Sequence, residues 1–159
     1  IVKLNKSLLL LSRIENGQFH EVKEIELNPI IKELVEDFQE IYEHKNLQIE
    51  VEETAVCKVR MNESLANILV TNLLKNAMIH TPNEGSITIR IQSAGISFTN
   101  STDGLTLDQN RLFTRFYQAD NKKSESTGLG LAIVQSITKL YNFRITYSFD
   151  GKHHFNLRF

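Results

Sequence analysis

Short segments in which apolar and polar residues alternate, joined by tight turns, most constrain what this chain can fold into. Residues 87–91 alternate isoleucine with polar residues, which predicts a strand with one apolar face. Gly95 marks a turn into a second strand at residues 97–100, and Asp150-Gly151 joins the last two strands, which is a strong hairpin signal. The chain is therefore expected to contain at least two antiparallel hairpins.

Helical signals separate these strands. Asn62 is expected to cap a long helix, and Asn28-Pro29 to begin another with Asn28 as its N-cap, while Gly17 ends an N-terminal helix. The expected helices cover residues 1–14, 28–44, 63–79 and 128–141, with a short helical segment at 110–117; further strands are expected at 22–27, 47–51, 56–61, 143–149 and 154–159. This order predicts an α/β two-layer sandwich, with a mixed β-sheet covered on one face by helices and preceded by an N-terminal helix.

Composition narrows the possible partners. The 159 residues include 18 basic and 19 acidic side chains, for a net charge of -1, so no overall field recruits nucleic acid and no nucleic-acid partner is expected. The single cysteine, Cys57, excludes an internal disulfide and favours a reducing, cytoplasmic setting. Because the chain starts at Ile1 rather than Met, we expect a piece of a longer protein, with any membrane anchor outside it.

One helix carries the first candidate site. Asn72 and Asn76 are four residues apart and share a helical face, which His80 extends by one turn. Carboxamides are poor core residues, and their carbonyl oxygens are hard ligands that suit magnesium shared with phosphate. The alternative is that these asparagines lie on a solvated helix face.

The second candidate is the segment TGLGLAIV, residues 127–134. Its glycines let the backbone approach an anion, and the helix that follows directs free N–H groups and its positive dipole end at phosphate. The polar residues before it, 119–126, are expected to form a lid over a ligand. The alternative is a glycine loop that serves only a tight turn.

An aromatic segment precedes this loop. In LFTRFY, residues 112–117, we expect Phe113 and Phe116 to anchor the chain in the core. Arg115 could face phosphate, or it could pair with a surface carboxylate. The histidines outside the asparagine helix, His20, His44, His153 and His154, are expected at the surface.

Together, NLLKNAMIHTP (72–82), LFTRFYQAD (112–120) and TGLGLAIV (127–134) resemble the ATP-binding domain of bacterial two-component sensor histidine kinases. That domain has the Bergerat fold shared with gyrase, heat-shock chaperone and mismatch-repair ATPases. The resemblance implies an ATP-binding catalytic domain at residues 18–159. Residues 1–17 resemble the C-terminal part of the second helix of the dimerisation and phosphoacceptor hairpin, whose first helix carries the phosphorylated histidine.

The resemblance also implies individual roles. The family's magnesium ligand falls on Asn76, Asn72 lies beside it on phosphate or metal-bound water, and His80 lies near the nucleoside. These two asparagines are the expected catalytic residues, and ATP with Mg²⁺ the expected cofactors. Further contacts to the nucleotide are expected from Asn100, Gly104, Arg115, Tyr117, Lys123, Thr127, Gly128, Leu129, Gly130 and Leu131.

Three departures from the family pattern affect binding. One is Ser126, which stands where the second glycine box often begins with glycine. Ile79 stands where the family usually has a phosphate-contacting lysine, a role that Lys122 or Lys123 could take over. The first glycine box, typically DxGxG, carries Asn100 in place of its adenine-reading aspartate and Thr102 in place of its first glycine. Weaker ATP binding and a softer preference for adenine are therefore expected.

The function implied is a protein-histidine kinase domain that donates the γ-phosphate of ATP to a histidine outside this chain, for relay to a response regulator. The full protein is expected to be a homodimer anchored in the inner membrane, with this domain in the cytoplasm. An ATP-hydrolysing relative is the first alternative, although such relatives carry a glutamate base at the position of Asn72, and asparagine cannot deprotonate water. A degenerate nucleotide-binding or docking module is the second alternative.

Overall fold

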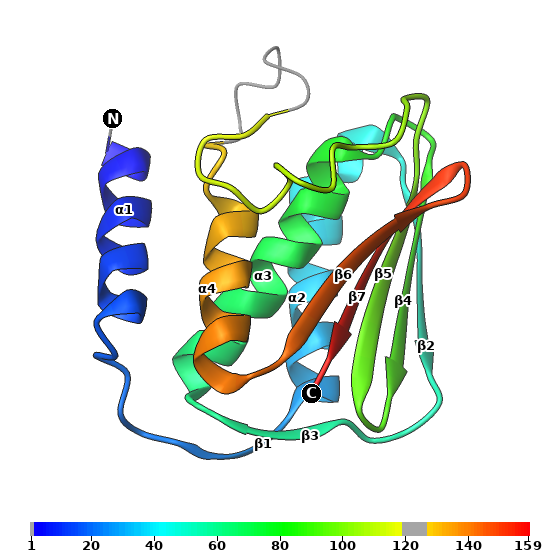
Figure 1. Cartoon of the computed structure of the whole chain (residues 1–159). Helices are drawn as coiled ribbons and strands as arrows, with labels where there is room; N and C mark the ends of the chain where they lie inside the picture. The colour runs from blue at the N-terminus through cyan, green and yellow to red at the C-terminus, as the bar shows by residue number, and fades with distance from the viewer. Residues whose placement is uncertain (1, 119–126) are drawn as a thin grey trace.

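The computed structural model describes residues 2–118 and 127–159. Its main feature is a five-stranded sheet with helices against one face (Figure 1). The helices are α1 (Val2–Glu15), α2 (Leu27–Ile41), α3 (Glu63–His80) and α4 (Gly130–Tyr141), with a short 3-10 helix η1 (Glu43–Lys45). The strands are β1 (Lys23–Glu26), β2 (Gln48–Glu53), β3 (Lys58–Met61), β4 (Ser86–Gln92), β5 (Gly95–Ser101), β6 (Arg144–Phe149) and β7 (Lys152–Arg158).

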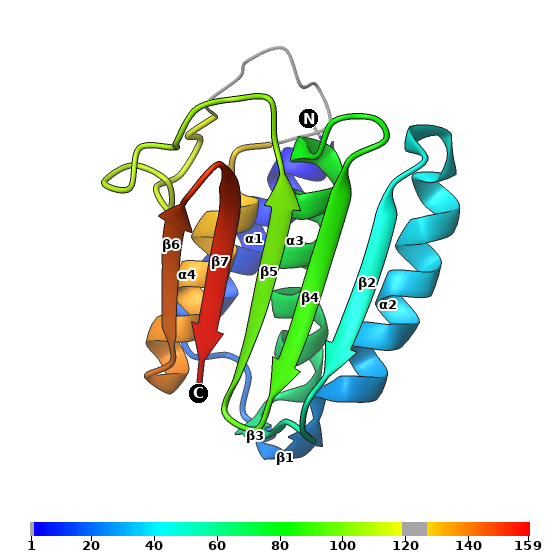
Figure 2. The same cartoon turned by 90° about the vertical axis from the view of Figure 1, so that its right-hand side faces the viewer.

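The sheet is mixed, as the sequence predicts. Its strand order is β2-β4-β5-β7-β6, in which β2 pairs parallel to β4 and the other neighbours pair antiparallel (Figure 2). Strands β1 and β3 form a separate antiparallel pair. Ile87, Ile89 and Ile91 of β4 are buried, which confirms the face predicted from their alternation.

Helices α2, α3 and α4 cover one face of the sheet, and α1 packs on α4 on the side away from the strands (Figures 1 and 2). Asn62 caps α3 as expected, because its side-chain oxygen accepts a hydrogen bond from the Leu65 amide at 3.1 Å. Leu11 and Ile14 of α1 are buried. The apolar seam of the N-terminal helix is therefore at least partly covered within this chain.

Asn28 is not the N-cap of α2, which corrects the expectation from sequence. The helix begins at Leu27, and Asn28 is buried inside its first turn. Its side chain donates to the carbonyl of Ala55 at 3.0 Å and accepts from the amide of Cys57 at 2.8 Å. These partners precede β3, so Asn28 joins α2 to a distant segment and leaves its own helix end without a side-chain cap.

The aromatic segment is also not helical. Residues 109–116 form consecutive turns, for example with the Thr114 amide donating to the Arg111 carbonyl at 2.9 Å. Phe116 has a φ of 65°, a left-handed conformation that ends any right-handed helical turn. Its amide donates to the Gly128 carbonyl at 2.7 Å, so the segment is closed by a distant partner.

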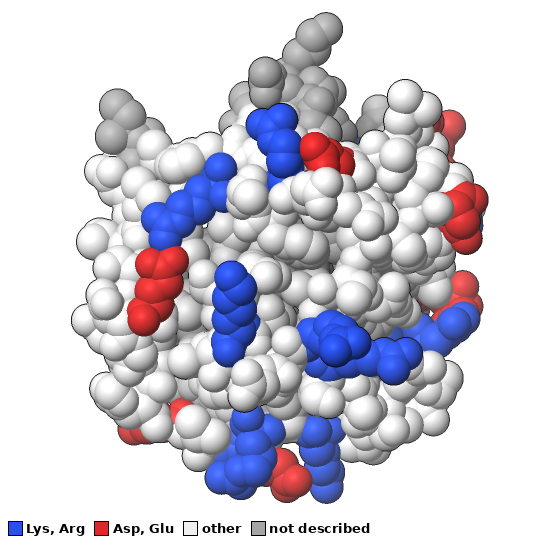
Figure 3. Space-filling view, viewed as in Figure 1, with Lys and Arg blue, Asp and Glu red and all other residues white. Residues whose placement is uncertain are grey.

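None of the helices in the described part of the chain is long and apolar enough to cross a membrane. Among the described residues on the face drawn in Figure 3, basic side chains occur singly or in small groups, with acidic ones between them. This scatter agrees with the net charge of -1.

Candidate nucleotide-binding site

A cavity of about 920 Å³ opens where the C-terminal half of α3, the start of α4 and the ends of β5 and β7 meet. These ends lie together at the top of Figure 1, beneath the connection that leads from β5 to α4. The expected contact residues that line the cavity are Asn72, Asn76, His80, Asn100, Gly104, Tyr117, Thr127, Gly128, Gly130 and Leu131. The fold thus brings together three sequence segments that are far apart in the chain.

The asparagine helix and the glycine segment touch each other at this cavity. The Asn72 amide nitrogen donates to the Ile68 carbonyl at 2.8 Å, which fixes the side chain along α3. A Cβ on Gly130 would come within 3.2 Å of the Asn72 side-chain oxygen. Glycine therefore lets α4 begin directly beside the asparagines.

Position 128 requires glycine more strictly than position 130 does. Its φ is +73°, and a Cβ there would lie 2.7 Å from the Cα of Phe116. The helix that follows has no side-chain cap at its first turn. Its free N–H groups and positive dipole end are therefore available to an anion, as the sequence argument requires.

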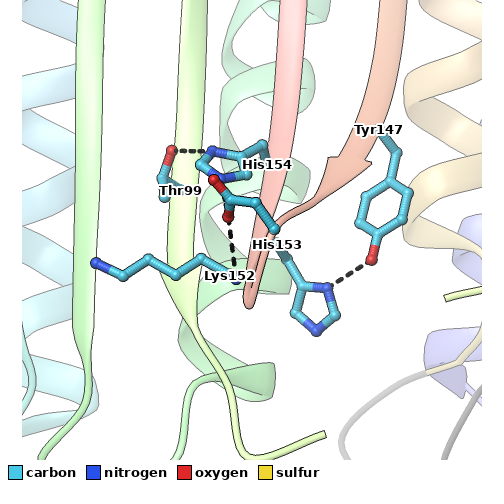
Figure 4. Close-up of polar contacts among 6 residues, drawn as sticks. Thr99, Tyr147, Lys152, His153 and His154 are labelled. Carbon is cyan, nitrogen blue, oxygen red and sulfur yellow. Dashed lines mark hydrogen bonds and ion pairs between the residues drawn. The ribbon is translucent and has the colours of Figure 1, made fainter. Parts of the chain in front are cut away.

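The end of the cavity at β5 and β7 is lined by buried polar side chains. Asn100 is only 2% exposed, and its amide nitrogen donates to the Ser101 carbonyl at 3.2 Å. His153 is 5% exposed and shares a 2.7 Å hydrogen bond with the Tyr147 hydroxyl (Figure 4). The surface position expected for His153 is wrong, because residues 153, 155 and 157 form the buried side of β7.

Two expected contacts lie elsewhere, and one lies outside the described residues. Arg115 does not line the cavity; its guanidinium forms an ion pair with Glu15 of α1. Leu129 is fully buried in the core and does not line the cavity. Lys123 belongs, with Lys122 and the expected lid at 119–126, to the residues that the structure does not describe.

The sequence did not predict that lysines of α1 and α3 line the cavity. Lys3 and Lys6 reach its wall from α1, beside the uncharged Ser7, and Lys75 reaches it from α3. The spacing of residues 3, 6 and 7 puts them on one face of α1, but nothing in the sequence placed that helix beside the nucleotide segments. The cavity therefore has positive side chains even though Ile79 replaces the usual lysine.

Within residues 2–118 and 127–159, no three His, Cys, Asp or Glu side chains gather where they could hold a metal ion by themselves. A hard cation in this cavity would have to take its protein ligands from amide oxygens such as that of Asn76, and the rest from water and from a bound anion.

Comparison with known proteins agrees with this geometry. The chain is 34% identical over 160 residues to the heme sensor protein HssS of Staphylococcus epidermidis, in an alignment that covers 98% of this chain and 35% of the relative. It is also 34% identical to HssS of Staphylococcus aureus, over 91% of this chain and 33% of the relative. The chain spans about a third of the length of these curated relatives.

Solved structures share the fold. The catalytic domain of the histidine kinase ThkA superposes with a TM-score of 0.73 at 23% identity, covering 86% of this chain and 93% of that one. Full-length ShkA, solved in complex with AMPPNP, superposes with a TM-score of 0.77 at 16% identity, over 98% of this chain and 34% of that one. At such identities the likeness concerns the fold alone.

The mixed sheet, its single helical layer and the cavity between α3 and α4 define an ATP-binding domain of the Bergerat class. The chain belongs to the family of histidine kinase-, DNA gyrase B- and HSP90-like ATPases, whose sequence profile matches residues 61–159. Its relatives within that family include the heme sensor protein HssS, and the structures that share its fold include histidine kinases.

Proposed function

We propose that this domain binds ATP with magnesium in the cavity and donates the γ-phosphate to a histidine on the phosphoacceptor helix of the same kinase dimer. In that step the histidine nitrogen bonds to the γ-phosphorus, the bond to the β–γ bridging oxygen breaks, and ADP leaves. The full protein would pass the phosphoryl group to a response regulator. The observation that carries the proposal is the meeting of Asn72, Asn76 and the uncapped start of α4 in one cavity.

The position of each residue in the cavity suggests its role in binding ATP and magnesium. Asn76 would hold magnesium through its side-chain oxygen, and Asn72 would contact phosphate or metal-bound water. The backbone of residues 128–130 and the first turn of α4 would bind phosphate. Magnesium supplies charge neutralisation when bound, and the protein supplies position. His80 and Tyr117 line the same cavity and would contact the nucleoside.

The proposal also includes the cellular location of the domain and the assembly of the full protein. The domain would work in the cytoplasm, and the full protein would be a homodimer anchored in the inner membrane. Asn72 disfavours an ATP-hydrolysing role, because an amide cannot act as the general base for water. A docking module with a degenerate pocket would bind ATP weakly or not at all.

Calorimetric titration of the chain with ATP, with and without MgCl₂, tests the proposal. We expect saturable binding that tightens with magnesium, and we expect Asn76→Ala to remove the magnesium dependence while the fold survives. Asn67→Ala is the matched control, because Asn67 is an exposed asparagine of the same helix, its side chain donates to the Glu63 carbonyl, and it does not line the cavity. Unchanged magnesium-dependent affinity in Asn76→Ala would rule out that assignment.

A further inference from the structure

The cavity reaches from the sheet to the N-terminal helix, and its two ends differ in character. At the sheet end its wall holds the buried polar side chains of Asn100 and His153. At the opposite end it holds Lys3 and Lys6 of α1, the helix that packs on α4 on the side away from the strands (Figure 1). A ligand that fills the cavity therefore meets buried polar groups at one end and lysines at the other.

The lysine cluster, which consists of Lys3, Lys6 and Lys75, has no counter-charge of its own. Within residues 2–118 and 127–159 none of the three forms an ion pair. Asp103, in the connection that follows β5, is the one carboxylate among the described residues that line the cavity. Lys3 and Lys6 are also neighbours on one helical face, where like charges repel. An anion that enters the cavity at α1 would relieve this repulsion.

The start of α4 lies between the two ends of the cavity. Gly128, Gly130 and Leu131 line the cavity there, and the first turn of α4 has no side-chain cap. A phosphate bound by the free N–H groups of that turn would lie between the sheet and α1. A chain of phosphates that continues from there, away from the sheet, runs toward the lysine cluster.

We propose that Lys3 and Lys6 are phosphate-binding residues supplied by α1, and that together with Lys75 they hold the terminal phosphate of a nucleoside triphosphate. The proposal rests on the proposed function, since it places ATP in the cavity. It deepens that function by making α1 part of the nucleotide site. A bound triphosphate then fastens α1 to the rest of the chain, in addition to the packing of α1 on α4.

The cluster should distinguish ATP from ADP. The phosphate that ADP lacks is the one that the lysines contact, so ADP leaves their charges uncompensated. Lys3 and Lys6 are exposed and Lys75 is half-buried, so solvent and salt screen each contact. We therefore expect each lysine to change the affinity for ATP severalfold, without any one of them abolishing binding.

Calorimetry with ATP, ADP and AMP, each with magnesium, tests which phosphate the cluster contacts. In a chain that carries both Lys3→Gln and Lys6→Gln, we expect the affinity for ATP to fall about five- to tenfold. The affinity for ADP should fall much less, and that for AMP should stay unchanged. Lys139→Gln is the matched control, because Lys139 is an exposed lysine that does not line the cavity. It should leave all three affinities unchanged.

A conservative pair of substitutions separates charge from packing. Lys3→Arg together with Lys6→Arg keeps both positive charges on side chains of similar reach. This chain should retain the preference for ATP over ADP that the glutamine pair loses. A role of the two lysines in the fold alone would not produce a difference between the nucleotides.

Hydrogen exchange of the α1 amides measures whether the nucleotide fastens the helix. We expect ATP–Mg to slow exchange in α1 of the unaltered chain more than ADP–Mg does. With Lys3→Gln and Lys6→Gln, saturating amounts of the two nucleotides should protect α1 equally. Equal protection of α1 by ATP and ADP in the unaltered chain would overturn the proposal.

The calorimetric outcomes separate this proposal from the proposed function. If the glutamine pair lowers the affinities for ATP, ADP and AMP by the same factor, or lowers none of them, the lysines do not hold the terminal phosphate. Either result would overturn their role and leave the proposed function standing, because the unaltered chain would still bind ATP. Failure of the unaltered chain to bind any of the three nucleotides would overturn both proposals together.

Discussion

Arg115 forms an ion pair with Glu15, the last residue of α1, and so joins the aromatic segment beside the cavity to the N-terminal helix. Both side chains are about half exposed, at 46% and 49%. The sequence left open whether Arg115 faces phosphate or a carboxylate, and here it contacts the carboxylate. A role on phosphate stays a prediction that requires Arg115 to exchange partners.

We expect Glu15→Gln to change the free energy of unfolding by less than about 1 kcal/mol, because solvent and salt screen an exposed pair. If Arg115 also reaches phosphate, the loss of its partner should raise ATP affinity slightly. Urea unfolding and an ATP titration of the same variant check both statements. A loss of stability well above that limit would show that the pair anchors α1.

Lys6 should contribute to nucleotide binding from α1. It lines the cavity with Lys3 and Lys75, while Ile79 leaves the usual lysine position uncharged. We expect Lys6→Gln to weaken ATP–Mg binding severalfold at low salt and less at high salt, because an exposed charge is screened. The matched control is Lys139→Gln, since Lys139 is exposed in the last turn of α4 and does not line the cavity. Equal salt dependence in the two variants would contradict the assignment.

We expect the free energy of unfolding to depend on pH, because the Asn28 side chain donates a hydrogen bond to the Glu53 carboxylate. Hydrogen bonds from Lys32 and then from Asn28 hold the pKa of Glu53 below its ordinary value of 4.5. That contribution is present above pH 4.5 and is lost as pH falls through the lower folded pKa. In Asn28→Ala we expect the pKa of Glu53 to rise, which a carboxyl NMR titration would measure.

The same variant should lose about 2 kcal/mol near neutral pH, because the buried amide of Cys57 loses its acceptor. The difference in unfolding free energy between Asn28→Ala and the unaltered chain should narrow as Glu53 becomes protonated. Urea unfolding at several pH values would show this. A difference that stays constant through the Glu53 titration would exclude the coupling.

The chain should not phosphorylate itself when it is given ATP–Mg. None of its five histidines lies on α1, and His153 is buried against Tyr147. Purified chain incubated with labelled ATP should therefore gain no acid-labile, base-stable phosphate. Labelling is expected once a helix carrying an acceptor histidine is joined ahead of α1. Phosphohistidine on the unextended chain would refute the prediction.

Local signals in the sequence predicted most of the fold. Ile87, Ile89 and Ile91 alternate because one side of β4 faces the core, and Asp150-Gly151 turns β6 into β7 with Gly151 at a φ of +99°. The capping hydrogen bond at Asn62 is also local, because its side-chain oxygen accepts from the amide of Leu65, three residues later. Patterns of this kind record interactions within a few residues, which is why they could be read directly.

The errors arose where distant contacts determine local structure. Asn28-Pro29 fits a helix start, but the partners of Asn28 lie in residues 53–57. The spacing of aromatic residues at 112–117 fits a helical turn, but Phe116 bonds to Gly128 instead. His153 could have been found, because it is in phase with Phe155 and Leu157 on the buried side of β7.

The hydrogen bond between the Phe116 amide and the Gly128 carbonyl has a practical consequence for protein engineering. It ties two chain positions together at the base of the connection to α4, and the close contact at Gly128 keeps that junction fixed. A side chain at position 128 would press on the Phe116 backbone, so engineered variants of this domain should keep glycine there.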